Sequence, residues 1–218
     1  MISKSFPVDL LIFDFDGTIT NSIPPAVKAI QKMLRMLELP YKTKEQINEH
    51  VGFGEIALIA GAIGTKEPEL FKKAMKMYES IYSKEGLKKV LPYPHVREML
   101  EYFKDKTKII LSNKKDLFIN KILGYLKLKR YFKEICGGDT LPVLKPDPRA
   151  IIQLMKKYGI DRDRVILVGD MSVDILTGKN AGILTCAVTY GFESKEKLRK
   201  FKPDLLIDDP MELKKLIK

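Results

Sequence analysis

The chain has 218 residues, of which 45% are hydrophobic and 31% are charged. This composition excludes general disorder, and the length suits one large core with a modest insertion. The formal net charge is +11, but the lysines are scattered and usually accompanied by glutamate, which predicts a solvated surface and no nucleic-acid partner. No apolar stretch approaches membrane-spanning length, so we expect a cytoplasmic protein with no membrane partner.

The first predicted element is a buried strand that ends at two carboxylates. An apolar run from Val8 to Phe13 stops at Asp14-Phe15-Asp16-Gly17-Thr18. A buried parallel strand that ends in this way is typical of a reactive site. Two carboxylates this close repel each other, so the pair is expected to share a proton or to hold a hard cation such as Mg2+. A simpler alternative is a helix cap or a turn after an ordinary strand.

After Thr18 the pattern changes from strand to helix. Apolar residues at helical spacing predict four helices, near 24–37, 43–50, 54–63 and 67–82. The last of these helices has two apolar stripes, which implies burial on two sides and hence a small helical bundle. We therefore expect an all-helical cap over residues 21–88, inserted between two parts of a core at 1–20 and 89–218.

From Leu91 onward, strands and helices alternate. Strand-like runs lie at 108–111, 134–136, 165–168, 184–188 and 205–207. Helical segments lie near 95–104, 116–125, 148–158, 173–181, 194–200 and 210–217. This alternation predicts a parallel sheet with helices on both faces, which the strand before Asp14 should join. The predicted fold class is α/β, with a Rossmann-like parallel-sheet core and an all-helical cap inserted after the first strand.

Polar residues also follow two other predicted strands. Ser112-Asn113-Lys114 follows the run at 108–111, and Gly169-Asp170 follows the run at 165–168, with Asp174 one helical turn further on. Ligands bind at the carboxyl ends of the strands in an open parallel sheet. These residues are therefore predicted to meet Asp14 and Asp16.

A third polar segment is Lys145-Pro146-Asp147-Pro148. Asp147 is expected to cap a helix with Pro148 at its first position, which places Lys145 just before a helix N-terminus.

Together these residue types suit phosphoryl transfer, which needs charge neutralisation, an in-line nucleophile and a proton for the leaving oxygen. Lys145 offers a point charge and Ser112 a hydroxyl donor. Backbone N–H groups near Phe15, Asp16 and Asn113 offer an anion cradle. One leading aspartate is expected to attack phosphorus while the other transfers a proton.

These motifs resemble the four motifs of the haloacid dehalogenase-like hydrolase superfamily. The helical insertion resembles the cap of the phosphoglycolate phosphatase and beta-phosphoglucomutase branch. Cys136-Gly137-Gly138-Asp139, ahead of Lys145, resembles the phosphoglycolate phosphatase subgroup. The chain departs from the family pattern at His95, where Pro-Gly is usual, and at Met171, where a serine is common.

The resemblance implies roles for individual residues. Asp14 is expected to be the nucleophile that forms an aspartyl-phosphate, and Asp16 the general acid/base. Ser112 and Lys145 are expected to bind the phosphate. Beside these roles from the resemblance, we also expect substrate or phosphate contacts from Phe15, Gly17, Thr18 and Asn113. The expected Mg2+ ligands are Asp14, Asp16 through its carbonyl, and Asp170, with Asp174 able to bind the metal or orient its waters.

The resulting prediction is a Mg2+-dependent phosphomonoester hydrolase for a small anionic phosphorylated metabolite, such as 2-phosphoglycolate. The cap residue Phe53 is expected either to reach the substrate or to pack within the bundle, and Lys42 or Lys44 could meet a substrate carboxylate. A phosphosugar mutase with the same intermediate and a phosphate-sensing or partner-binding module without turnover remain alternatives. The sequence leaves both a monomer and a homodimer open.

Overall fold

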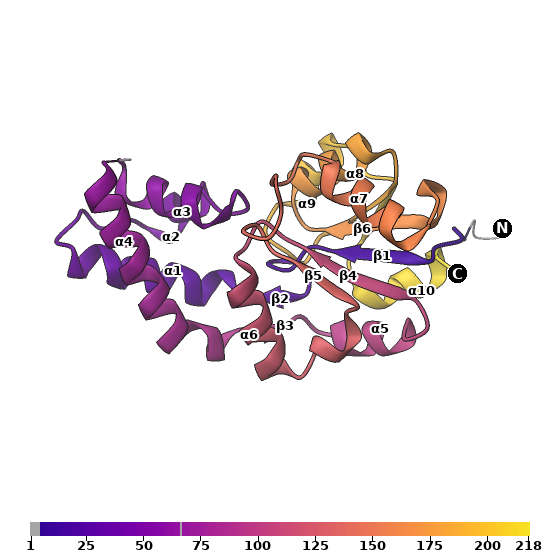
Figure 1. Ribbon diagram of the computed structural model, residues 1–218, viewed down its shortest axis with the longest axis horizontal. Coiled ribbons are helices and arrows are strands. Elements are labelled where there is room, and N and C mark those ends of the chain that lie inside the picture. Colours follow the sequence, from indigo (N-terminus) through magenta and orange to yellow (C-terminus); the bar gives the residue numbers. More distant parts are fainter. Residues whose placement is uncertain (1–4, 66) are drawn as a thin grey trace.

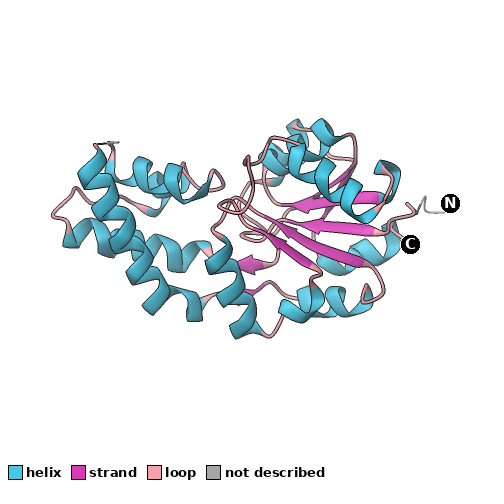
Figure 2. Ribbon diagram, in the orientation of Figure 1, coloured by secondary structure: helices cyan, strands magenta, loops and turns pink. Residues whose placement is uncertain are grey.

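The computed structural model describes residues 5–65 and 67–218, and it has two lobes (Figure 1). One lobe holds helices, and the other holds a sheet between layers of helices (Figure 2). Residues 1–4 of the predicted first core segment lie outside the described part of the chain. Within that part, no helix is long and apolar enough to cross a membrane.

The core is built on a six-stranded sheet with the order β5-β4-β1-β6-β7-β8, and every neighbouring pair is parallel. Its strands are β1 (Leu10–Phe13), β4 (Thr107–Leu111), β5 (Glu134–Cys136), β6 (Val165–Gly169), β7 (Leu184–Val188) and β8 (Leu205–Ile207). The strand that precedes Asp14 therefore lies in the middle of the sheet, between β4 and β6. The predicted α/β fold class is confirmed.

Alternating side chains of β1 explain why helices cover both faces of the sheet. The core helices are α5 (Val96–Tyr102), α6 (Asp116–Leu126), α7 (Arg149–Tyr158), α8 (Ser172–Ala181), α9 (Lys195–Lys200) and α10 (Leu213–Leu216). Leu10 and Ile12 belong to the hydrophobic cluster on the face of α7 and α8, whereas Leu11 and Phe13 belong to the cluster on the face of α5, α6 and α10. Short 3-10 turns are η3 (Lys129–Tyr131), η4 (Arg162–Arg164) and η5 (Pro210–Glu212).

The four helices predicted for the cap are present. They are α1 (Ile23–Met36), α2 (Lys44–Asn48), α3 (Gly54–Ile63) and α4 (Pro68–Ile81), followed by a π-helical turn, η1 (Tyr82–Gly86), and a 3-10 turn, η2 (Leu87–Lys89). The ring of Tyr82 stacks on Tyr78 with centroids 5.5 Å apart and meets Phe118 of α6 edge-on at 5.2 Å. Aromatic packing thus joins the end of the cap to the core.

Two features differ from the sequence-based expectation. Strands β2 (Thr20–Asn21) and β3 (Leu91–Pro92) form a two-stranded antiparallel sheet where the chain passes between the lobes, and each is too short to leave a pattern. The start of α7 also lies one residue later than predicted, since Pro148 is the N-cap and Arg149 the first helical residue. Asp147 still caps this end of the helix, because its carboxylate accepts the Arg149 N–H at 2.9 Å.

Candidate active site

The carboxyl ends of β1, β4 and β6 bring the predicted site residues together. Phe13 is level with Ile110 of β4 and Val168 of β6 in the parallel ladders. The residues that follow these strands therefore emerge at the same edge of the sheet. Asp14 and Ser112 line one cavity at this edge together with Lys145.

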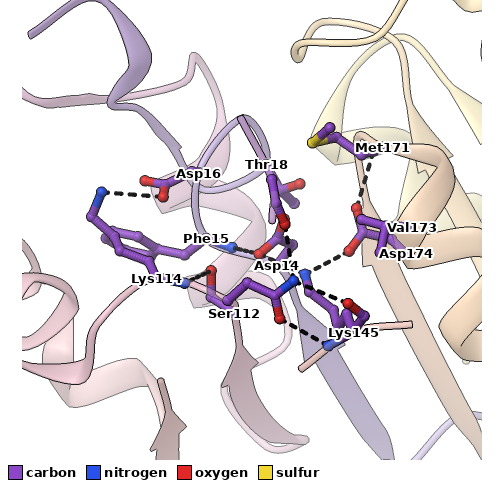
Figure 3. A network of polar contacts seen from close by, with 12 residues as sticks. Asp14, Phe15, Asp16, Thr18, Ser112, Lys114, Lys145, Met171, Val173 and Asp174 are labelled. Carbon is purple, nitrogen blue, oxygen red and sulfur yellow. Dashed lines mark hydrogen bonds and ion pairs between the residues drawn. The ribbon is translucent and has the colours of Figure 1, made fainter. Parts of the chain in front are cut away.

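Lys145 lies between two aspartates (Figure 3). Its Nζ is 2.9 Å from Asp14 Oδ1 and 2.6 Å from Asp174 Oδ1, and all three side chains are buried. Burial alone would lower the pKa of Lys145, but the charges of the two aspartates outweigh it and raise that pKa above its usual value. Lys145 is therefore a fixed positive charge beside Asp14. The Phe15 N–H, expected in the anion cradle, donates to Asp14 Oδ1 at 2.7 Å.

Three buried carboxylates form a cluster. Asp14, Asp170 and Asp174 each offer an oxygen within 4.8 Å of the others. Asp170 accepts hydrogen bonds from Thr18 Oγ1 at 2.9 Å and from the Phe192 N–H at 2.7 Å. Several hard oxygen donors crowded into a buried space fit a divalent cation such as Mg2+.

Burial raises the pKa values of two members of this cluster. It raises the pKa of Asp170 well above its usual value, and the charges of Asp14 and Asp174 act in the same direction. It raises the pKa of Asp174 to about 6, although the neighbouring Lys145 charge opposes the shift.

Glycines make room for the carboxylates. A Cβ on Gly17, whose φ is +86°, would lie 2.1 Å from Asp170 Oδ2. A Cβ on Gly191 would lie 2.2 Å from the Asp170 Cβ and 2.5 Å from the Gly17 carbonyl oxygen. No side chain fits at either position without displacing Asp170. Gly191 was not anticipated, because nothing in the local sequence indicates that its loop folds against Asp170.

The Asp16 side chain lies outside the carboxylate cluster. It accepts a hydrogen bond from Ser22 Oγ and pairs with Lys114, whose Nζ is 3.2 Å from Asp16 Oδ2. Each leading aspartate thus has its own ammonium partner, Lys145 for Asp14 and Lys114 for Asp16. Figure 3 shows Lys114 and Lys145 on opposite sides of Asp14. The metal contact expected of the Asp16 backbone carbonyl stays a prediction.

Asn113 holds its neighbours in place. Its side-chain amide donates to the Gly52 carbonyl at 2.9 Å and accepts from the Lys145 N–H at 2.8 Å. It therefore connects the cap loop before α3 to the lysine beside Asp14. Ser112 lines the same cavity, and its Oγ accepts the Lys114 N–H at 3.4 Å. The phosphate contacts expected from both residues stay predictions.

The site opens into a cavity of about 60 Å³ between cap and core. The core side carries the charged residues, and the cap side is mostly apolar, with Ile23, Val27, Ile30, Ile47, Val51 and Leu58. The cap also contributes one buried carboxyl, Glu55, which accepts the Lys115 N–H at 3.1 Å.

Not every predicted substrate contact reaches this cavity. Gly52 and Gly54 line it, whereas Phe53 between them is 52% exposed and is not among the lining residues. Lys42 and Lys44 do not line it either. Sequence reasoning did not single out Lys114 or Glu55 as site residues. Lys114 stands within a recognised motif, but its burial and that of Glu55 depend on the cap meeting the core.

A parallel sheet whose central strand ends in two aspartates, with a buried lysine, a serine and further aspartates under a helical cap, defines a cap-bearing α/β enzyme for phosphate chemistry. Residues 11–188 match the haloacid dehalogenase-like hydrolases. The chain therefore belongs to this superfamily.

Individual relatives indicate the branch. The chain is 31% identical over 219 residues to the phosphoglycolate phosphatase of Vibrio parahaemolyticus, covering 96% of each chain. It is 34% identical over 211 residues to that of Psychrobacter arcticus, covering 92% of this chain and 91% of that one. It superposes with a TM-score of 0.91 on the crystal structure of a predicted phosphoglycolate phosphatase from Haemophilus somnus, at 27% identity, covering 96% of this chain and 97% of that one. The protein is a phosphatase of the phosphoglycolate phosphatase-like branch.

Proposed function

We propose that this phosphatase is a Mg2+-dependent phosphomonoester hydrolase that works through an aspartyl-phosphate on Asp14. Its substrate in this proposal is a small anionic phosphate ester such as 2-phosphoglycolate. The observation that carries the proposal is the position of Asp14. Its buried carboxylate contacts Lys145, lies within 4.8 Å of Asp170 and Asp174 and lines the cavity between cap and core.

Because Asp14 forms a covalent intermediate in this proposal, the reaction has two steps. In the first, an Asp14 oxygen bonds to phosphorus while the ester P–O bond breaks, and Asp16 gives its proton to the leaving oxygen. In the second, water attacks phosphorus, Asp16 accepts a proton from that water, and inorganic phosphate leaves as the Asp14–phosphorus bond breaks. Lys145 and the Ser112 hydroxyl bind the phosphoryl oxygens throughout.

The carboxylates of Asp14, Asp170 and Asp174, with the Asp16 carbonyl, would hold the metal. Bound there, Mg2+ supplies positive charge that offsets the repulsion between these carboxylates and the phosphoryl group.

The size of the cavity supports a small substrate. One water molecule needs roughly 10–15 Å³ of such space, so a cavity of about 60 Å³ holds only a few. A space of this size suits a small ester, and no observation favours the mutase alternative. The relatives named phosphoglycolate phosphatases support the same choice. The complete set of site residues supports turnover over a phosphate-sensing or partner-binding module.

The test is phosphate release from a panel of phosphate monoesters, with and without Mg2+. We expect Mg2+-dependent release, highest for small anionic esters. Asp14→Asn should lower turnover by about 10⁴-fold or more, because the amide cannot act as the nucleophile. The matched control is Asp147→Asn, since Asp147 pairs with Arg149 away from the cavity. Release from no ester, or full activity of Asp14→Asn, would contradict the proposal.

A further inference from the structure

Lys114 is a buried cation that lines the cavity but takes no part in the two proposed steps of hydrolysis. It follows Ser112 and Asn113 at the end of β4, and its side chain is 6% exposed. Its Nζ lies 3.2 Å from Asp16 Oδ2 and 4.9 Å from the centre of the Tyr82 ring. Burial opposes its charge, but Asp16, the two cap tyrosines and Glu55 together raise the pKa of Lys114 well above its usual value. A charged ammonium is therefore held at the boundary between core and cap.

The two lysines of the cavity are engaged differently. Lys145 contacts two carboxylates, Asp14 and Asp174. Lys114 has one carboxylate partner within ion-pair distance among the described residues, Asp16. An ammonium has three N–H donors, so Lys114 retains donors for a further anion.

Lys114 lies on the side of Asp14 where the leaving group of the substrate is expected. In the proposed mechanism, a phosphoryl group bound at Asp14 has its ester oxygen next to Asp16, so that the rest of the substrate extends toward the cap. The cap side of the cavity offers apolar side chains and the carboxyl of Glu55. A buried anion must be paired to avoid a large desolvation cost. Among the described residues that line the cavity, Lys114 is the cation on this side of Asp14.

We propose that Lys114 determines substrate specificity by binding a second anionic group, a carboxylate on the carbon next to the ester oxygen. The inference rests on the proposed hydrolase function and assigns the residue that selects its substrate class. Because Lys114 also contacts Asp16, a substrate carboxylate competes with Asp16 for the ammonium. Binding of the correct substrate thus loosens the Lys114–Asp16 pair and frees the Asp16 side chain to reach the leaving oxygen.

The experiment compares two small esters, 2-phosphoglycolate and ethyl phosphate, which differ by the carboxylate. We expect wild type to prefer 2-phosphoglycolate in kcat/KM by about 100-fold or more. Lys114→Met should lower kcat/KM for 2-phosphoglycolate by about 100- to 1000-fold and for ethyl phosphate by less than about 10-fold, since only the first ester loses an ion pair. Lys114→Arg should keep most of the preference, because it keeps the charge.

The matched control is Lys115→Met. Lys115 is the next residue, with the same charge, but its Nζ pairs with Glu79 and it does not line the cavity. This variant should keep the wild-type preference. If Lys114→Met does not fold, as judged by circular dichroism, Lys114→Gln removes the same charge from a polar side chain and should show the same loss of preference.

Three results would overturn the inference while the proposed function stands: a wild type that hydrolyses both esters equally well, neutral Lys114 variants that lose activity on both esters equally, or neutral Lys114 variants that keep the preference. A loss of preference in Lys115→Met as large as in Lys114→Met would also overturn it. Phosphate release from neither ester nor any other monoester by wild type would instead overturn the proposed function, and the inference with it.

Discussion

At the scale of single residues, the site separates two carboxylates that the sequence places only two positions apart. Asp14 faces Lys145 and the carboxylate cluster, whereas Asp16 faces Ser22 and Lys114. Gly17, with φ of +86°, follows Asp16 and turns the backbone toward the start of the cap. The two aspartates can therefore hold different roles despite their proximity in sequence.

Gly191 provides a test of how closely Asp170 must be placed. Gly191→Ala should lower kcat/KM by about 100-fold, because displacement of a reacting or metal-binding group by about 1 Å can cost that much. The Cβ has no room, since the nearest atoms are the Asp170 Cβ and the Gly17 carbonyl oxygen. The control is Gly124→Ala in α6, where nothing lies within 4 Å of the added carbon. It should leave activity unchanged and stabilise the protein by about 0.5–1 kcal/mol. Equal activity of the two variants would contradict the assignment.

His95 gives a pH-dependent contribution to stability. It is the N-cap of α5 at φ 59°, and its Nδ1 contacts the Asp209 carboxylate. The hydrogen bond that His95 Nδ1 donates to Asp209, together with the negative charge of Asp209, raises the pKa of His95 above its usual value of 6.5. Burial alone would raise the pKa of Asp209, but the His95 hydrogen bond outweighs it and lowers that pKa. The stabilisation is therefore fully present below about pH 6.5, down to about pH 4, and is lost as the pH rises through the raised pKa of His95.

His95→Gly tests this window by urea unfolding at about pH 5.5 and about pH 8.5. Glycine removes the ion pair but suits the positive φ at every pH. The stability of the variant relative to wild type should therefore improve at the higher pH. Asp209→Asn, which removes the same pair without changing residue 95, should show the same trend relative to wild type. Differences from wild type that do not change with pH would show that the pair contributes nothing.

At the scale of elements, the cap meets the core through α3 and the loop before it. Glu55 of α3 accepts the N–H of Lys115, the N-cap of α6, and the Gly52 carbonyl accepts a hydrogen bond from Asn113. A Cβ on Gly52 would lie 2.5 Å from Met171 Sδ. These contacts hold the cap against the core beside the cavity.

Glu55→Ala should lower kcat/KM by about 10- to 100-fold, mainly through a higher KM, because a buried N–H left without its acceptor costs about 1–3 kcal/mol. Glu55→Gln keeps an oxygen that can accept the Lys115 N–H, so most of the activity should remain. Steady-state kinetics on the best substrate of the panel decides the matter. Wild-type kcat/KM in Glu55→Ala, or equal losses in both variants, would exclude this role.

How far the sequence predicts the fold and site depends on the kind of contact. Strands such as Leu10–Phe13 and Val165–Gly169 are continuous apolar runs with polar ends, so both the sheet and the residues at its edge could be inferred. The partners of Lys114 and Glu55 come from the other lobe, and no local pattern encodes that approach. Strands β2 and β3 have two residues each, too few for any periodicity.

At the scale of the whole molecule, cap and core share one hydrophobic cluster. It includes Ile30 and Met33 of α1 together with Phe13 of β1 and Phe118 of α6. The lobes are therefore expected to unfold together rather than as independent units.

Met33→Ala tests this coupling, since Met33 is 0% exposed. The variant should lower the free energy of unfolding by about 2–5 kcal/mol. Amide hydrogen exchange should show that protection falls in the core strands as well as in the cap. Met36→Ala on the same helix, where the side chain is 54% exposed, should change stability by no more than about 0.5 kcal/mol. Loss of protection confined to the cap would mean that the lobes unfold separately.

The central claim is that Asp14 carries the phosphoryl group during turnover. The most direct measurement is peptide mass spectrometry of enzyme quenched in acid during turnover of its best substrate with Mg2+. We predict one added phosphoryl group on the peptide that contains Asp14, assigned to Asp14 by fragmentation and absent from Asp14→Asn. A phosphoryl group on another residue such as Ser112, or sustained turnover by the Asp14→Asn variant, would contradict the claim.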